Sequence, residues 1–282
     1  HLEFPTNLYP WMNLSSRGVE FRRVDLIDGR VTPESVFELM DDRTRVVALS
    51  LVQFWNGYRL DVDTIGVECR RRGALLVLDA VQGVGALRID VSAQPIDALA
   101  AGTSKWLLGG PGAGFAWIRP DLIERLDPPL IGTRSTTKPQ EYFEPELNLW
   151  STGRRFEESD LNWPLVASFL GGAELLAEVG IGPIEERVLE NSERLSTGLS
   201  GLGFEILEPW PRTRSESSGI VSFRSPGEDP EELMRYLDES RVKAQLRRDF
   251  IRFSPHFYNN REDVDGVLDL MASRPVRSAA GR

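Results

Sequence analysis

Short apolar runs and amphipathic stretches alternate through the first half of the chain. The runs at 46–52, 74–78 and 96–101 consist mainly of aliphatic residues, which predicts strands buried on both faces of a sheet. Residues 32–40 open with a Thr-Pro pair that marks a helix start, and residues 61–72 keep helical spacing. Strands that alternate with helices predict right-handed βαβ units and a mainly parallel sheet.

Less regular segments surround these elements. The alternation at 19–24 predicts another strand, as does the apolar run at 114–118, and residues 120–126 predict a short helix. Two prolines favour a loop at 4–11, and a stretch rich in Pro, Thr, Ser and Gly predicts a long loop at 127–153. We therefore expect an α/β fold in this part of the chain, with helices flanking the sheet.

Long helical stretches and a different order of strands fill the second half of the chain. Two helical stretches are predicted at 164–179 and 184–202. Three strands and one helix are then predicted at 204–207, 219–223, 250–254 and 230–239. This order of elements is typical of a smaller α+β domain.

The change of pattern near Gly180 predicts a domain boundary. We expect a large domain over 1–179 and a small C-terminal domain over 180–274. Residues 275–282 are predicted to form a disordered tail.

Composition limits the classes of partner. The chain has 282 residues, of which 41% are hydrophobic, and it carries a net charge of −10 with a pI of about 4.9. Such an acidic protein is a poor ligand for nucleic acids or anionic membranes. No apolar run approaches the roughly 18 residues of a membrane-spanning helix. We therefore expect neither nucleic-acid nor membrane partners.

The cysteine and histidine content limits the chemistry. The single cysteine, Cys69, rules out an internal disulfide and favours a cytoplasmic location. Cys69 follows Ile65 by four residues on the same predicted helical face, so we interpret it as a core residue rather than a nucleophile. Two histidines are too few for a His/Cys zinc cluster, and no metal site is expected.

Polar residues follow two of the predicted buried strands. Asp79 comes directly after the run at 74–78, and Lys105 follows the run at 96–101 and a Gly-Thr-Ser turn. Ligands of open α/β sheets bind at the carboxyl ends of strands, although Asp79 alone is equally compatible with capping a turn. A lysine in an apolar pocket attacks carbonyl groups, and pyridoxal phosphate requires such a lysine together with an acid for its ring nitrogen.

Two other phosphate-binding motifs do not fit the glycine-rich residues 109–114. A P-loop places its lysine directly after the last glycine, whereas Lys105 precedes these glycines. A dinucleotide-binding motif leads into a helix, whereas these glycines lead into the predicted strand at 114–118. A plain glycine turn is the simpler alternative.

These motifs together resemble a known family. The chain carries, in order, Asp79-Ala-x-Gln82, Asp90, Asp97, Ser104-Lys105-Trp106 and Gly112-x-Gly114. This pattern is similar to that of the class V aminotransferases, fold-type I pyridoxal-phosphate enzymes that include cysteine desulfurases, isopenicillin N epimerase-like proteins and kynureninase. The resemblance extends from Phe4 to about Asp269. It implies pyridoxal 5'-phosphate, an amino-acid substrate, a homodimer, and a further segment of the large domain before His1.

The resemblance implies roles around the cofactor ring. Lys105 would form the Schiff base and then move the α-proton of the substrate. Asp79 would keep the ring nitrogen protonated, and Gln82 would hydrogen-bond the ring hydroxyl. Phe4 would stack on the ring face, and Asn7 would lie near the ring hydroxyl.

The resemblance also implies contacts to the phosphate and the substrate. Ser104 would reach the phosphate, where related proteins use His or Tyr. Arg252 would bind the α-carboxylate of the amino acid, although an arginine in a buried strand is also compatible with a structural ion pair. We interpret His256 and Tyr258 as packing and turn residues.

The chain departs from the family pattern at three points, and the second means that the family's phosphate contact from the neighbouring subunit is not expected here. Phe54 stands where many desulfurases place an asparagine, and Ser159-Asp160 replaces a Gly-Thr pair whose threonine reaches the phosphate of the neighbouring subunit. No cysteine follows Cys69, so persulfide-forming desulfurase chemistry is not expected. Transamination, epimerisation, C–S cleavage and kynureninase-like hydrolysis stay open. The alternative from another class is a cofactor-free or inactive family member that acts as a dimerisation or binding module.

Overall fold

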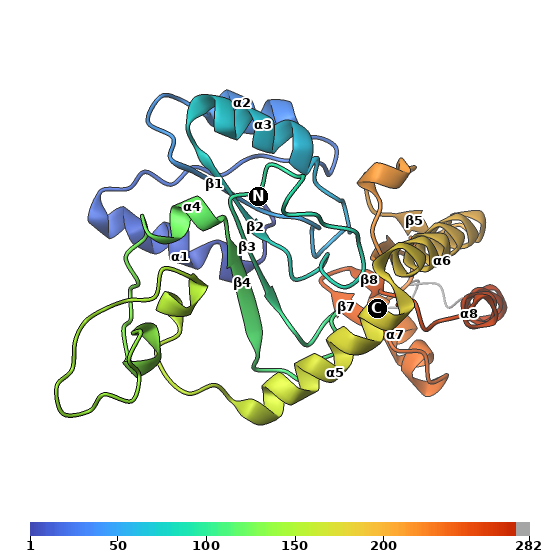
Figure 1. The fold of residues 1–282 in the computed structure, drawn as a ribbon. Coiled ribbons are helices and arrows are strands. Elements are labelled where there is room, and N and C mark those ends of the chain that lie inside the picture. Colours follow the sequence, from blue (N-terminus) through green and yellow to red (C-terminus); the bar gives the residue numbers. More distant parts are fainter. Residues whose placement is uncertain (275–282) are drawn as a thin grey trace.

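The computed structural model describes residues 1–274 and contains two four-stranded sheets (Figure 1). The first sheet has the order β1 (Val46–Ser50), β2 (Leu75–Asp79), β3 (Ala98–Gly102) and β4 (Gly114–Ile118). β1, β2 and β3 run parallel, and β4 runs antiparallel to β3. The predicted α/β architecture with a mainly parallel sheet is confirmed. The tail predicted at 275–282 lies outside the described residues.

Helices α2 (Pro33–Leu39) and α3 (Val62–Arg72) lie side by side (Figure 1). Each begins at a capping side chain: Thr32 Oγ1 accepts from the backbone N–H of Ser35, and Asp61 Oδ1 accepts from that of Thr64. Ile65 and Cys69 are fully buried on α3. Burial raises the pKa of the Cys69 thiol to about 11, which agrees with its interpretation as a core residue.

The apolar runs of the parallel strands build the first core. Leu76 and Leu78 of β2 are buried, with Val47 and Leu49 of β1 beside them. Burial alternates along β2 and β3, whose other positions are partly or fully exposed, so the prediction that these strands are buried on both faces is wrong for the described residues.

The second sheet is antiparallel, in the order β5 (Glu205–Ile206), β6 (Val221–Arg224), β8 (Phe250–Phe253) and β7 (Gln245–Arg247). Its core centres on the fully buried Phe223. The sequence predicted three of these strands and missed β7. The associated helices are α6 (Ile181–Gly201), α7 (Pro230–Glu239) and α8 (Arg261–Ser273).

Two long helices connect the sheets. α5 (Trp163–Val179) and α6 meet at Gly180 with a bend of 87° (Figure 1). The first half of α6 contributes Ile184 and Val188 to the core of the first sheet, whereas its second half packs on the second core. The domain boundary near Gly180 stays a prediction. Within residues 1–274 no single helix is long and apolar enough to cross a membrane, although the bent α5–α6 pair meets that test by length and composition.

Two predicted elements near the N-terminus are wrong. Residues 4–11 are not a loop, because Pro5 and Pro10 occupy first-turn helical positions, where a missing N–H is tolerated. Most of these residues lie in η1 (Pro5–Asn7) and in α1 (Tyr9–Asn13). The short helix η2 (Leu14–Arg17) follows directly. Residues 19–24 form no strand, because no described strand pairs with them.

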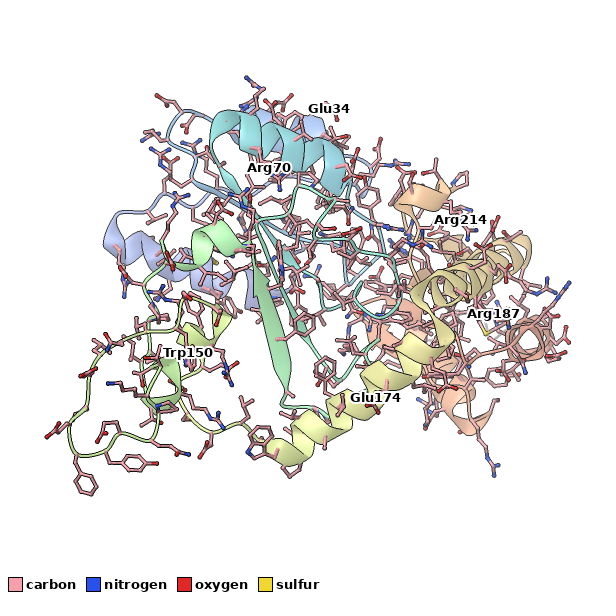
Figure 2. All side chains as sticks on the ribbon, viewed as in Figure 1. Glu34, Arg70, Trp150, Glu174, Arg187 and Arg214 are labelled. Atoms are coloured by element: carbon pink, nitrogen blue, oxygen red, sulfur yellow. The ribbon has the colours of Figure 1, made fainter. Side chains whose placement is uncertain are left out.

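The remaining short helices are α4 (Pro120–Ile123), η3 (Thr133–Ser135), η4 (Gly153–Phe156) and η5 (Arg214–Glu216). The predicted helix at 120–126 is therefore shorter than expected. The predicted loop at 127–153 contains only η3 and the beginning of η4, and it projects from the body of the protein (Figure 1). Trp150 lies near the base of this projection, as Figure 2 shows.

Candidate active site

The carboxyl ends of β1, β2 and β3 form one edge of the first sheet. In the strand register Ser50 lies opposite Asp79, and Asp79 lies opposite Ala100. The segments that follow these three strands begin at this edge, as expected for an open parallel sheet. Asp79 and Lys105, which are far apart in the sequence, therefore belong to neighbouring segments of the same edge.

Glu3 anchors the N-terminal segment at this edge. Its carboxylate accepts hydrogen bonds from the Ser50 backbone N–H (2.9 Å) and the Ser50 hydroxyl (2.6 Å). The same carboxylate also accepts from the backbone N–H of Phe4 (2.7 Å). These bonds bring Phe4 to the end of β1, where its ring meets Phe54 edge-on at 5.2 Å between centroids.

Asp79 is a largely buried carboxylate. Its Oδ1 accepts from the backbone N–H of Val81 (3.0 Å), so the residue does cap the following turn. Burial raises the pKa of Asp79, and the nearby charge of Glu3 raises it further. No cation pairs with Asp79 in residues 1–274. A positively charged group at its second oxygen would relieve this electrostatic cost.

The segment after β3 folds back on itself. The Thr103 hydroxyl donates to the Gly110 carbonyl (2.9 Å), and the Gly109 N–H donates to the Thr103 carbonyl (2.9 Å). Helix α5 packs on this turn so closely that a Cβ at Gly172 would lie 2.3 Å from the Leu107 carbonyl oxygen. Ser104 and Lys105 thus project exposed side chains from a tightly held turn.

Gln82 joins the turn after β2 to the segment that carries Lys105. The indole Nε1 of Trp106, the residue directly after Lys105, donates to Gln82 Oε1 at 3.0 Å. Trp106 is only 4% exposed, whereas Gln82 is partly exposed, so the donor side of this hydrogen bond is shielded from water. Gln82 and the lysine-bearing segment are therefore neighbours in the structure.

Asn7 lies close to the ring-stacking candidate Phe4. Its Oδ1 accepts a long hydrogen bond of 3.4 Å from the Trp11 indole. Its Nδ2 is buried and has no hydrogen-bond partner among the described residues. The amide donor of Asn7 is therefore not used by the surrounding protein.

Arg252 reaches the site from the small sheet. It is 7% exposed, and its Nη1 donates to the Phe54 carbonyl at 2.6 Å. Its Nε is buried without a partner, and no carboxylate pairs with it in the part of the chain that the structure describes. Burial, with a smaller contribution from the charge of Arg247, lowers the pKa of Arg252 to about 10. The alternative of a structural ion pair therefore has no support among these residues.

His256, which follows β8 of the second sheet, contacts the segment that carries Lys105. Its Nδ1 accepts from the Phe257 backbone N–H (2.8 Å), which leaves Nε2 as the protonated nitrogen that donates to the Trp106 carbonyl (3.1 Å). Burial lowers the pKa of His256, so the ring is neutral in this arrangement. The predicted packing role of His256 thus includes a specific bond to the residue after Lys105.

Asp160 does not stand as an isolated negative charge. Its carboxylate pairs with the Arg134 guanidinium at 3.0 Å. Arg134 also lies over the Trp163 ring at 5.7 Å, which ties the projecting loop to the start of α5. The Asp160 charge is thereby partly neutralised within this chain.

Sequence reasoning missed Glu3 and the bonds made by Trp106. Glu3 directly precedes Phe4, but nothing in its neighbourhood predicts a partner 47 residues away. Trp106 follows Lys105, and only its burial against Gln82 and His256 shows that it does more than fill space. In residues 1–274 no three His, Cys, Asp or Glu side chains are grouped to hold a metal ion.

Comparison with solved structures defines the fold. The structure of the cystine C-S lyase C-DES with cysteine persulfide matches with a TM-score of 0.86 at 24% identity, over 96% of this chain and 73% of that chain. This likeness establishes the fold. A mainly parallel sheet of this topology, with helices on its flanks, is that of the fold-type I pyridoxal-phosphate enzymes.

The sequence comparisons give the family. The model of the family described as "Aminotransferase class-V" matches residues 1–267. An uncharacterized aminotransferase of Schizosaccharomyces pombe is 30% identical over 277 residues, which are 95% of this chain and 68% of the relative. One of Bacillus subtilis is 27% identical over 279 residues, 98% of this chain and 71% of the relative. Other relatives are named probable cysteine desulfurase (Pyrococcus abyssi), kynureninase (Pseudomonas fluorescens) and isopenicillin N epimerase (Amycolatopsis lactamdurans).

The chain belongs to the class V aminotransferase family, which confirms the resemblance drawn from its motifs. It is an enzyme of the transferase or lyase type, and its cofactor is pyridoxal 5'-phosphate.

The raised pKa of Asp79 predicts a cost to the cofactor-free fold. The pKa of Asp79 is higher in the folded protein than in the unfolded chain, where it is about 3.9. Its contribution to stability is therefore fully present below the unfolded pKa and is lost as the pH rises through the folded pKa. Asp79→Asn is therefore expected to increase the free energy of unfolding at neutral pH, and the gain is expected to vanish near pH 4. Urea unfolding of cofactor-free protein across this pH range measures both effects.

Asp90→Asn is the matched control. Hydrogen bonds from Ser92 lower the pKa of Asp90, so this substitution is expected to decrease stability at neutral pH. A loss of stability in both variants would contradict the assignment of an unrelieved buried charge to Asp79.

Proposed function

We propose that this enzyme acts on an α-amino acid, with the cofactor held by Lys105 and the substrate carboxylate bound by Arg252. The observation that carries the proposal is a pair of buried charges without partners. Asp79 has no cation and Arg252 has no anion among the described residues, although both are largely buried. Unpaired buried charges are costly, and they are typical of sites that bind a charged ligand.

The residues at the strand ends fit the cofactor. Pyridoxal 5'-phosphate, when bound, supplies a protonated ring that withdraws electrons from the bonds around the substrate α-carbon. The free oxygen of Asp79 is suited to accept the ring N–H, and the amide N–H of Gln82 is suited to donate to the ring hydroxyl. The Phe4 ring, 44% exposed, presents an apolar face for stacking.

The exposed side chains complete the proposed set. Lys105 provides the amine that attaches the cofactor and then takes the α-proton, and the Ser104 hydroxyl provides a phosphate contact. The unused Nδ2 of Asn7 is a further donor for the ring hydroxyl. At Arg252 the buried Nε has no partner, which leaves that side of the guanidinium for a carboxylate.

For the reaction itself, the proposal names a group of reaction types and not a single one. The family supports an aminotransferase, or a C–S lyase or epimerase type of reaction. The relatives include proteins named cysteine desulfurase, so this activity is not excluded. The only cysteine is the buried Cys69, which argues against a persulfide on a mobile loop. A cofactor-free binding module is the second candidate, and cofactor retention separates it from the enzyme.

We also propose a homodimer. The projecting loop exposes large apolar side chains, with Phe143 93% exposed and Tyr142 and Leu147 each 70% exposed. Such side chains on one segment favour an interface.

Light scattering is expected to give twice the chain mass, and Phe143→Ser is expected to shift the protein towards monomer. A monomeric wild-type protein would contradict the proposal. A cytoplasmic location stays a prediction.

Borohydride reduction followed by peptide mass mapping tests the role of Lys105. The chain has only three lysines, Lys105, Lys138 and Lys243, so the label has few possible sites. We expect the reduced cofactor on Lys105 alone, because only this lysine lies at the strand-end site. Lys105→Ala is expected to lower turnover at least about 10²-fold without changing the circular dichroism spectrum. Lys243→Ala, which alters an exposed lysine, is the control.

Two results would overturn this assignment. One is label on Lys138 or Lys243 in the wild-type protein. The other is wild-type turnover in Lys105→Ala. A protein that stays colourless and unlabelled after addition of pyridoxal phosphate would favour the binding-module alternative.

Substitution of Arg252 tests how the carboxylate is bound. Arg252→Gln is expected to raise KM for an amino acid about 10- to 100-fold, because charge-assisted hydrogen bonds contribute roughly 1.5–3 kcal/mol. An amine that lacks the carboxylate is expected to react equally with both proteins. Arg224→Gln, in the neighbouring strand β6, removes an exposed guanidinium and is the control. An equal loss for both substrates would show that Arg252 acts on the fold instead.

A further inference from the structure

Trp106 is held from several sides. Its indole Nε1 donates to Gln82 Oε1 (3.0 Å), and its carbonyl accepts from His256 Nε2 (3.1 Å). The Trp106 and His256 rings lie 5.1 Å apart between centroids. A Cβ at Gly219 would lie 2.3 Å from Trp106 Cη2, so the ring fills the space that the missing side chain leaves. The indole has no room to turn.

This arrangement determines which end of the Gln82 amide, the oxygen or the NH₂ group, points towards Trp106. An indole N–H is a donor only, so Gln82 must present its oxygen to Trp106. The amide NH₂ then faces away from the indole, and no partner for it is recorded within residues 1–274. Without Trp106 the amide is able to rotate by a half turn, because its oxygen and nitrogen ends have nearly the same shape.

We propose that Trp106 is a positioning residue that fixes Gln82 as a hydrogen-bond donor, with His256 and Gly219 holding the indole in place. This inference rests on the proposed function, in which the Gln82 NH₂ donates to the ring hydroxyl oxygen of the cofactor. A donor at that oxygen stabilises its negative charge, whereas a rotated amide presents a carbonyl oxygen that repels it.

Trp106→Phe removes the indole N–H and keeps an aromatic ring. In the enzyme with bound cofactor, we titrate the visible absorbance of the cofactor against pH. We expect the midpoint of this titration to rise by about half to one pH unit. We also expect the cofactor Kd to increase about 3- to 10-fold. Gly219→Ala, which keeps the N–H and displaces the ring, is expected to shift the same midpoint in the same direction.

A double-mutant cycle separates positioning from general loss of packing. Gln82→Met removes the amide, so Trp106→Phe is expected to cause no further shift of the midpoint in that background. Trp117→Phe is the matched control. Trp117 lies on β4 opposite Leu99 of β3, away from the site edge, so this substitution is expected to leave the midpoint unchanged. Shifts that add in the double variant would overturn the proposal.

A second readout needs no cofactor. In the NMR spectrum of cofactor-free protein, Gln82→Met is expected to move the indole N–H resonance of Trp106 and not that of Trp117. An unmoved Trp106 resonance would show that the hydrogen bond is absent and would overturn the inference. If the wild-type protein bound no cofactor, the proposed function would fall along with this inference. If it bound cofactor but the cycle were additive, only the inference would fall.

Discussion

A buried contact between Trp106 and His256 joins the segment that carries Lys105 to the segment that follows β8 of the second sheet. Trp106 directly follows Lys105, and it contacts His256, which lies four residues after Arg252. The segments that carry the proposed cofactor lysine and the proposed carboxylate-binding arginine therefore meet at this contact, and the bond from Arg252 to the Phe54 carbonyl joins the two sheets again. Because packed interiors resist small displacements, this contact limits relative movement of the two segments.

The treatment of buried charge distinguishes the site from the scaffold. Asp97 is 1% exposed, but it pairs with Arg119 at 2.9 Å and accepts from the Leu76 N–H at 2.7 Å. Asp79 and Arg252 are also largely buried, yet neither has an opposite charge among the described residues. Asp97 is thus paired within the protein, whereas Asp79 and Arg252 are free to pair with the charged groups of a ligand. Such sites reduce the stability of the empty protein in exchange for binding.

The sequence predicted correctly those helices and strands whose signals lie within a few neighbouring residues. β1 to β3 and α3 were predictable, because aliphatic runs and caps such as Asp61 act within a few residues. The strand predicted at 19–24 was wrong, because alternation does not guarantee a pairing partner. β7 was missed because it is short and largely exposed, and α8 was missed although Asn260 and Asp263 form a capping box.

By itself the sequence determined the α/β class, the family motifs and the candidate residues, since these depend on residue type and short spacing. Only the tertiary structure decided which groups meet. Glu3 and Ser50 are 47 residues apart, Gln82 and Trp106 are 24 apart, and His256 bonds the Trp106 carbonyl across 150 residues. The sequence alone does not reveal such hydrogen bonds, because their geometry depends on how distant segments pack on the core and not on neighbouring residues.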